Sequence, residues 1–169
     1  MESFSPRYTF CGQIAEKVLK KHGPSSPPVN VHKIAKREGF EVAYLDWPSG
    51  LDGLLDPAVR KIGLNRNVAP TRLRFTLAHE LGHALLNHNV ISDRPPDIDH
   101  PPEATAKLYP RHLEQEANAF AGALLVPRTL LRDAVRVHRT PKALAHAFEV
   151  SEAVMCIRLE ITKLVRALV

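Results

Sequence analysis

The decisive stretch is Arg74-Phe75-Thr76-Leu77-Ala78-His79-Glu80-Leu81-Gly82-His83, which contains the pattern HExxH. On a helix, four residues advance the chain by about one turn, so His79 and His83 project from nearly the same face and can hold one cation. Glu80 is offset by about 100° around the helix and can reach a water beside that cation. The pattern therefore predicts a zinc-dependent hydrolase with His79 and His83 as metal ligands and Glu80 as general base.

The residues around the motif predict one amphipathic helix, which is the element that its chemistry requires. Thr71 is the expected N-cap, directly after Pro70, and the helix should continue through Asn87. Gly82 is a poor helix former, so we expect close packing or access to the cation at that position. Apolar side chains recur at helical spacing and predict a face for the core: Leu73, Phe75, Leu77, Ala78, Leu81 and Leu85.

A catalytic zinc ion usually has three protein ligands, so one more must lie downstream. His88 is five residues past His83, about 140° around the helix, which argues against it as a ligand. The next strong helix pattern spans Arg111 to Leu125 and contains Glu114 and Glu116. The third ligand is therefore expected among these two glutamates.

Glu114 is the favoured third ligand, and Glu116 is the alternative. Glu114 and Asn118 are four residues apart and share a face with small Ala121, whereas Glu116 lies about 200° from Glu114. Asn118 can then accept a hydrogen bond from the ring N–H of a ligand histidine and determine its tautomer. A plainer interpretation makes both glutamates solvated surface charges.

With these motifs in place, the chain resembles the ImmA/IrrE metallopeptidases, which are zincins of the gluzincin type. The similarity runs from Val29 to about Leu159. The segments that carry it are Pro28-Val29-Asn30-Val31, Ile34-Ala35, Gly39-Phe40, Gly53-Leu54, Ile62-Gly63-Leu64-Asn65, Arg74 to His83, Glu114 to Ala121, Leu124-Leu125-Val126-Pro127, Leu144-Ala145, Phe148-Glu149-Val150-Ser151 and Arg158-Leu159.

The resemblance implies a cytoplasmic bacterial or phage zinc endopeptidase that cleaves a partner helix-turn-helix repressor, often in response to DNA damage or stress. It maps the Zn²⁺ ligands onto His79, His83 and Glu114, and the HExxH glutamate onto Glu80. The alternative is a non-catalytic regulator that contains zinc and binds a repressor or DNA. The adjacent carboxylate base and the lack of an evident fourth protein ligand favour catalysis.

The expected fold is α+β and zincin-like, with a small antiparallel sheet packed on a helical core that includes the HExxH helix. Helices are predicted at Tyr8–His22 and from Asn30, as N-cap, through Glu38. Short strands are predicted at Glu41–Asp46, Gly53–Asp56 and Lys61–Asn65. If Lys61–Asn65 is an edge strand beside the cleft, an extended substrate could pair with it.

The 169 residues, 44% of them hydrophobic, predict one domain over 1–169. We expect a catalytic core at about 28–127 and a C-terminal helical subdomain at about 128–169. Thr140 and Ser151 are the expected N-caps of a final helix pair that imitates a helix-turn-helix unit. The last helix begins Glu152-Ala153-Val154-Met155-Cys156, poor in base-reading side chains, so we favour packing on the core over contact with DNA.

The segment from Ser92 to Pro110 is rich in proline and predicts a long exposed loop that could cover the cleft. His100 and Tyr109 within it could stabilise an oxyanion, although loop residues of these types lie more often on the surface.

The remaining composition indicates a soluble, cytoplasmic protein, since no stretch approaches a membrane span or a leader peptide. The net charge of +5 comes from dispersed basic residues, which permits an acidic partner or nucleic acid without indicating one. Cys11 and Cys156 fit no metal or redox spacing and are expected to be reduced.

Overall fold

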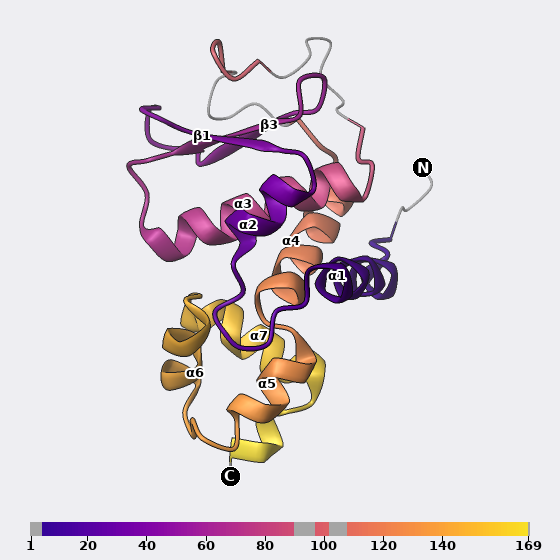
Figure 1. Ribbon diagram of the computed structural model, residues 1–169, viewed down its shortest axis with the longest axis vertical. Coiled ribbons are helices and arrows are strands. Elements are labelled where there is room, and N and C mark those ends of the chain that lie inside the picture. Colours follow the sequence, from indigo (N-terminus) through magenta and orange to yellow (C-terminus); the bar gives the residue numbers. More distant parts are fainter. Residues whose placement is uncertain (1–4, 90–96, 102–107, 169) are drawn as a thin grey trace.

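The computed structural model describes residues 5–89, 97–101 and 108–168. These residues form an α+β fold with a three-stranded sheet, seven α-helices and a final 3-10 turn (Figure 1). In chain order the elements are α1 (Tyr8–His22), α2 (Val31–Arg37), β1 (Glu41–Leu45), β2 (Gly53–Asp56), β3 (Lys61–Asn65), α3 (Pro70–Leu85), α4 (Arg111–Leu125), α5 (Arg128–Ala134), α6 (Pro141–Phe148), α7 (Glu152–Thr162) and η1 (Val165–Leu168).

The three predicted strands are present, but the sheet is mixed and its order is β1-β3-β2. β1 runs parallel to β3, with Val42 opposite Ile62, and β2 runs antiparallel to β3, with Leu55 opposite Ile62. The expected antiparallel sheet is therefore wrong for one of its two pairs. The hypothesis that Lys61–Asn65 is an edge strand is also wrong, because β3 is the central strand. Strand patterns show which face is buried but do not determine the order of strands.

The two faces of the sheet have different coverings. Leu55, Ile62 and Leu64 belong to the main core, on the side of the HExxH helix. The other face carries a small cluster of Trp47, Leu54 and Ile98. Gly63 makes room for this cluster, since a Cβ there would lie 2.5 Å from the Trp47 ring.

The segment expected to be an exposed loop is only partly described, since Pro95, Pro96 and Pro102 lie outside the described residues. Its described parts, 97–101 and 108–110, contain no regular element, as predicted. Ile98 and Tyr109 are nevertheless buried, with 3% and 6% of their surfaces exposed. The expectation of exposure is wrong at these two positions because apolar side chains from the segment pack back onto the protein.

Local signals predicted most helix ends, but both ends of α3 differ from the prediction: the helix expected to continue through Asn87 ends at Leu85. α1 has the predicted bounds, and the Asn30 side chain caps α2 by accepting a hydrogen bond from the Lys33 amide. α3, however, begins at Pro70 with Ala69 as N-cap, so the prediction of Thr71 as N-cap is wrong. Proline suits the first helical position because its φ is already helical and its missing N–H would have no partner there.

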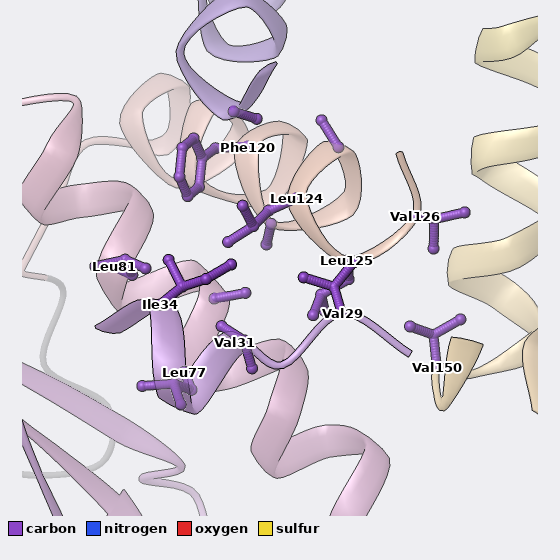
Figure 2. Packing of buried hydrophobic residues seen from close by; sticks show 14 of the residues in the cluster. Val29, Val31, Ile34, Leu77, Leu81, Phe120, Leu124, Leu125, Val126 and Val150 are labelled. Atoms are coloured by element: carbon purple, nitrogen blue, oxygen red, sulfur yellow. The ribbon is translucent and has the colours of Figure 1, made fainter. Parts of the chain in front are cut away.

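One continuous hydrophobic core joins the N-terminal and C-terminal helices. Around α4, Figure 2 shows Phe120 and Leu124 packed near Leu81 of α3 and Ile34 of α2. Near the end of α4, Val126 lies towards the C-terminal helices (Figure 2). Residues of those helices in the same cluster are Leu131, Leu144, Phe148, Met155 and Leu159. The α6–α7 pair thus shares the core that supports the HExxH helix.

The caps of the last two helices confirm the prediction. Thr140 accepts a hydrogen bond from the Ala143 amide, and Ser151 accepts one from the Val154 amide.

The single arginine of α7, Arg158, is buried and donates to the Val126 carbonyl. The exposed side of α7 is acidic and apolar, with Glu152, Ala153, Cys156, Ile157, Glu160 and Ile161. This side offers no Arg, Asn or Gln, the side chains that read guanine and adenine by bidentate hydrogen bonds. Within the described residues, no helix has the length and apolar character needed to cross a membrane.

Candidate metal centre

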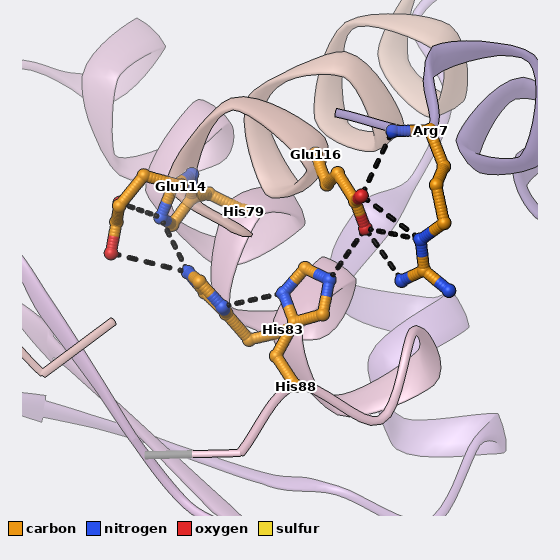
Figure 3. A network of polar contacts seen from close by, with 6 residues as sticks. All are labelled: Arg7, His79, His83, His88, Glu114 and Glu116. Atoms are coloured by element: carbon orange, nitrogen blue, oxygen red, sulfur yellow. Dashed lines mark hydrogen bonds and ion pairs between the residues drawn. The ribbon is translucent and has the colours of Figure 1, made fainter. Parts of the chain in front are cut away.

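Side chains from two helices, His79 and His83 of α3 and Glu114 of α4, meet at one point (Figure 3). The Nε2 atoms of the two histidines are 3.0 Å apart. Glu114 Oε2 lies 3.2 Å from His79 Nε2, and Glu114 Oε1 lies 3.6 Å from His83 Nε2. The three ligand atoms all lie within 4.8 Å of one another.

The donor atoms of these three side chains fit a zinc ion. Zinc bonds of about 2.0–2.2 Å at tetrahedral angles place neighbouring ligand atoms roughly 3.3 Å apart. The separations of 3.0, 3.2 and 3.6 Å lie around that value. Two imidazole nitrogens and one carboxylate oxygen are also the donors found in catalytic zinc sites that keep a position open for water. The geometry and the chemistry of the set therefore agree.

A close contact between α3 and α4 brings the three side chains together. A Cβ added at Gly82 would lie 3.0 Å from Phe120 Cδ1 and 3.3 Å from the Ala117 carbonyl oxygen. Glycine at this position of α3 is therefore explained by close packing against α4, which is one of the two reasons expected from the sequence.

Asn118, also on α4, contacts Nδ1 of His79, the ring nitrogen that is not beside Glu114. Its Oδ1 lies 2.9 Å from His79 Nδ1. Because an amide oxygen only accepts hydrogen bonds, Nδ1 carries the proton and Nε2 keeps a lone pair directed towards His83 and Glu114.

Glu80 lies in the same cleft and is 8% exposed. Burial raises the pKa of its carboxyl to about 7, with a further rise from the charge of Glu114 and opposing effects from His79 and the Leu55 amide. A carboxylate with a pKa near neutrality is suited to accept and return a proton. β2 approaches Glu80 closely, because a Cβ at Gly53 would lie 3.2 Å from Glu80 Cγ.

Tyr109 is an aromatic neighbour of the candidate metal cluster, which consists of His79, His83 and Glu114. Its ring stacks on that of His83, with centroids 3.7 Å apart and planes at 15°. Burial also raises the pKa of the phenol. The expectation of a surface position is wrong for Tyr109, although His100 is indeed exposed, beside Asp97. One sequence feature could have placed Tyr109 near the site: it immediately precedes Pro110, the N-cap of α4, the helix that carries Glu114.

The alternative ligand Glu116 lies away from the metal cluster and is 1% exposed. It accepts hydrogen bonds from the backbone amide and guanidinium of Arg7, and its Oε2 lies 3.1 Å from His88 Nε2. The guanidinium of Arg7, opposed by burial, lowers the pKa of Glu116 to about 2. The Glu116 carboxylate is therefore bound by Arg7 and His88 rather than grouped with His79, His83 and Glu114, and it is not a solvated surface charge.

His88 was set aside as a ligand by its angle on an extended helix, but α3 ends before it. Asn87 has a φ of 55°, a left-handed conformation that turns the chain back. His88 Nδ1 consequently lies 2.9 Å from His83 Nδ1, on the side of the ring that faces away from Glu114. Burial, together with His79 and His88, lowers the pKa of His83 to about 2, so its ring is neutral.

The candidate metal cluster opens into a cleft of about 980 Å³. The start of β2, one side of α3 and the beginning of α4 form its walls, and Ser151 and Val154 reach it from the C-terminal helices. Charged and apolar side chains both line it, among them Asp52, Leu54, Arg72, Phe75, Tyr109 and Arg111. A cavity of this size is in the range of sites that bind small molecules or short peptide segments.

A solved structure described as a Mycobacterium tuberculosis transcriptional regulator has a similar fold. The TM-score is 0.62 at 18% sequence identity, over 89% of this chain and 47% of that one. At this identity the similarity concerns the fold alone.

Two curated relatives are both described as radiation response metalloprotease IrrE. The Deinococcus deserti protein is 39% identical over 134 residues, which cover 76% of this chain and 45% of the relative. The Deinococcus radiodurans protein is 34% identical over 97 residues, which cover 56% of this chain and 28% of the relative. The matched region is thus less than half the length of either relative.

The sequence model of one protein family, Peptidase_M78 (IrrE N-terminal-like domain), matches residues 35–160. This match spans more than half of the chain and includes His79, Glu80, His83 and Glu114. The resemblance stated from the motifs is confirmed, and the chain belongs to the Peptidase_M78 family.

Proposed function

We propose that this protein is a zinc-dependent endopeptidase of zincin type. In this proposal His79, His83 and Glu114 hold the metal, Glu80 is the general base, and Asn118 positions His79. The observation that carries it is the spacing of the three ligand atoms, all within 4.8 Å, beside a buried carboxyl with a raised pKa. The metalloprotease description of the two IrrE relatives supports the same activity.

The residues of the cleft can perform the proton transfers of peptide hydrolysis. Zinc, when bound, supplies Lewis-acid activation of water and of the scissile carbonyl. Glu80, half ionised near pH 7, accepts the proton of the attacking water and later donates it to the leaving amine. Burial keeps bulk water from competing for that proton, and Asn118 keeps the lone pair of His79 Nε2 directed into the site.

The outer edge of β2 is the proposed platform for the substrate. Among the described residues β2 pairs only with β3, and its beginning lines the cleft at Gly53 and Leu54. An extended peptide could add as a further strand at this edge, with its backbone beside Glu80. The proposed substrate is a segment of a helix-turn-helix repressor, the class that the family resemblance implies.

The test uses purified, zinc-loaded protein and a helix-turn-helix repressor encoded beside its gene, with products identified by mass spectrometry. We expect one defined cut that is lost in Glu80→Gln while zinc remains bound. Glu38→Gln is the matched control, since Glu38 pairs with Lys21 and His22 away from the cleft. Binding without cleavage by the wild type would instead support the non-catalytic regulator. Unchanged cleavage by Glu80→Gln would refute the role of Glu80.

A further inference from the structure

The second ligand histidine has contacts on both of its ring nitrogens. His83 Nε2 faces His79 and Glu114, and His83 Nδ1 lies 2.9 Å from His88 Nδ1. From His88 the contacts continue to Glu116 and then to Arg7, which we call the Arg7–Glu116–His88 network (Figure 3). The network is buried at its centre, with His88 and Glu116 side chains each 1% exposed.

We propose that the Arg7–Glu116–His88 network positions His83 by determining which of its nitrogens carries the proton. The inference rests on the proposed zinc site but not on peptidase activity. It adds Arg7, Glu116 and His88 to the metal centre as positioning residues that act through His83.

The direction of each hydrogen bond follows from the chemistry of the groups. An ionised carboxylate only accepts, so His88 must donate from Nε2 to Glu116. The neutral His88 ring then has a lone pair on Nδ1, which can only accept. His83 must therefore carry its proton on Nδ1, and its Nε2 keeps the lone pair that a metal ligand needs.

Loss of the charge on Glu116 would remove this constraint. A glutamine in its place can donate as well as accept, so His88 could turn its proton towards His83. His83 would then carry its own proton on Nε2, between His79 and Glu114, where it opposes a cation. The network thus excludes the tautomer that cannot bind metal.

Arg7 keeps Glu116 ionised and in place. A buried carboxylate without a partner is costly, and Arg7 supplies its backbone amide at 2.9 Å and its guanidinium at 2.7 Å. Arg7 is the N-cap residue of α1 and lies outside the family match at residues 35–160. The N-terminal helix is therefore joined to the metal centre by a specific polar contact as well as by apolar packing.

The chain contains a matched control with the same pair of groups. His22 Nε2 lies 2.6 Å from Glu38 Oε1, and the His22 side chain is 5% exposed. This pair joins α1 to the end of α2 and contacts none of the proposed ligands. Glu38→Gln therefore removes a buried histidine–carboxylate contact without changing the metal centre.

The first readout is zinc affinity, measured by competition with a chromophoric chelator. We expect Glu116→Gln to weaken binding by roughly 10- to 100-fold, the usual effect of losing a group that orients a ligand histidine. Glu38→Gln should bind zinc as the wild type does. Equal affinity of folded Glu116→Gln and wild type would overturn the inference, whereas absence of zinc binding by the wild type would overturn the proposed function.

The second readout is the tautomer of His83 in the metal-free protein, from long-range ¹H–¹⁵N correlations of the imidazole rings. The wild type should show the proton on Nδ1, and Glu116→Gln should show a mixture, while His79 stays unchanged through Asn118. A wild-type His83 protonated on Nε2 would refute the inference.

A third variant covers the case in which Glu116→Gln does not fold. Arg7 is half-exposed, so Arg7→Ala should leave the fold intact and weaken zinc binding several-fold, with partial recovery in Arg7→Lys. If folded Arg7→Ala bound zinc as tightly as the wild type, Arg7 would have no part in positioning His83.

Discussion

Two glutamates, two residues apart on α4, have opposite surroundings. Glu114 is 41% exposed on the cleft side and lies beside His79 and His83. Glu116 is 1% exposed on the inner side and is held by Arg7 and His88. Two helical steps separate their directions by about 200°, which places the two carboxyl groups on opposite sides of α4.

The difference shows how one helix supplies two kinds of carboxylate to the same histidine. His83 turns Nε2 towards Glu114 and Nδ1 towards the His88–Glu116 pair. The cleft-side carboxylate is accessible to a cation, whereas the inner carboxylate already has protein partners. We infer that the first binds and the second orients, and the following changes test that distinction.

The largest expected effect is on zinc binding in Glu114→Gln. A ligand contributes roughly a quarter of the ~10–16 kcal/mol of a four-ligand zinc site, so affinity should fall by about a few hundredfold. The metal-free protein should keep its stability within about 0.5 kcal/mol because the side chain is partly exposed. Chelator competition and urea unfolding measure the two quantities. A loss no greater than that of Glu116→Gln would contradict the distinction.

The next effect concerns acid stability of the metal-free protein. The folded pKa of Glu116, about 2, lies below the ordinary value of 4.5, because the hydrogen bond from Arg7 outweighs burial. A lowered carboxyl pKa stabilises the fold above pH ~4.5, and this contribution is lost as pH falls towards 2. It is worth roughly 2 kcal/mol after allowing for solvent screening of half-exposed Arg7.

Urea unfolding of the wild type and of Glu116→Gln, at several pH values between 3 and 6, measures this contribution. The difference in unfolding free energy should shrink as the pH falls. A difference that is the same at every pH would show that Glu116 stabilises the fold by packing rather than by charge.

An effect of similar size is expected where Gly82 of α3 packs against α4. Gly82→Ala should destabilise the protein by about 1–3 kcal/mol, because the new Cβ meets Phe120 and the Ala117 carbonyl. The matched control is Gly12→Ala in α1, where a Cβ meets nothing within 4 Å. That change should stabilise the helix by up to about 1 kcal/mol. Equal effects of the two substitutions in thermal unfolding would refute the close-packing explanation.

The smallest effect is on thiol chemistry at the inner side. Both cysteines are free, as predicted, but Cys11 is buried and Cys156 is exposed. Burial, and then the charge of Glu116, raises the pKa of Cys11 to about 11. At pH 8 a thiol reagent should therefore modify Cys156 promptly and Cys11 only after unfolding. Rapid modification of both thiols in the native protein would show that the inner side opens easily.

Local patterns predicted much of the fold because their causes are local. The bounds of α1, the caps at Asn30, Thr140 and Ser151, and the three strands follow from backbone and side-chain preferences within a few residues. The same holds for the relation of Glu114 to Asn118, since both lie on one helix. The N-cap at Thr71 was wrong because Pro70 suits the first helical position.

The inner side of the metal centre could not be predicted in this way. Arg7 and Glu116 are 109 positions apart in the chain and meet only because α1 packs on α4. His88 was judged by the angle of a helix that in fact ends at Leu85, and the left-handed Asn87 changes its direction. The mixed sheet likewise depends on which strand lies in the centre.

The sequence alone determined the chemistry: an HExxH helix, a second helix with Glu114, and membership of a metallopeptidase family that the comparisons confirm. Tertiary structure decided how that chemistry is arranged, with Glu114 on the cleft, Glu116 inside, and Tyr109 stacked on His83. The physical reason is the distance along the chain over which each effect acts. Helix period and capping act over a few residues, whereas burial and hydrogen-bond partners depend on segments that only folding brings together.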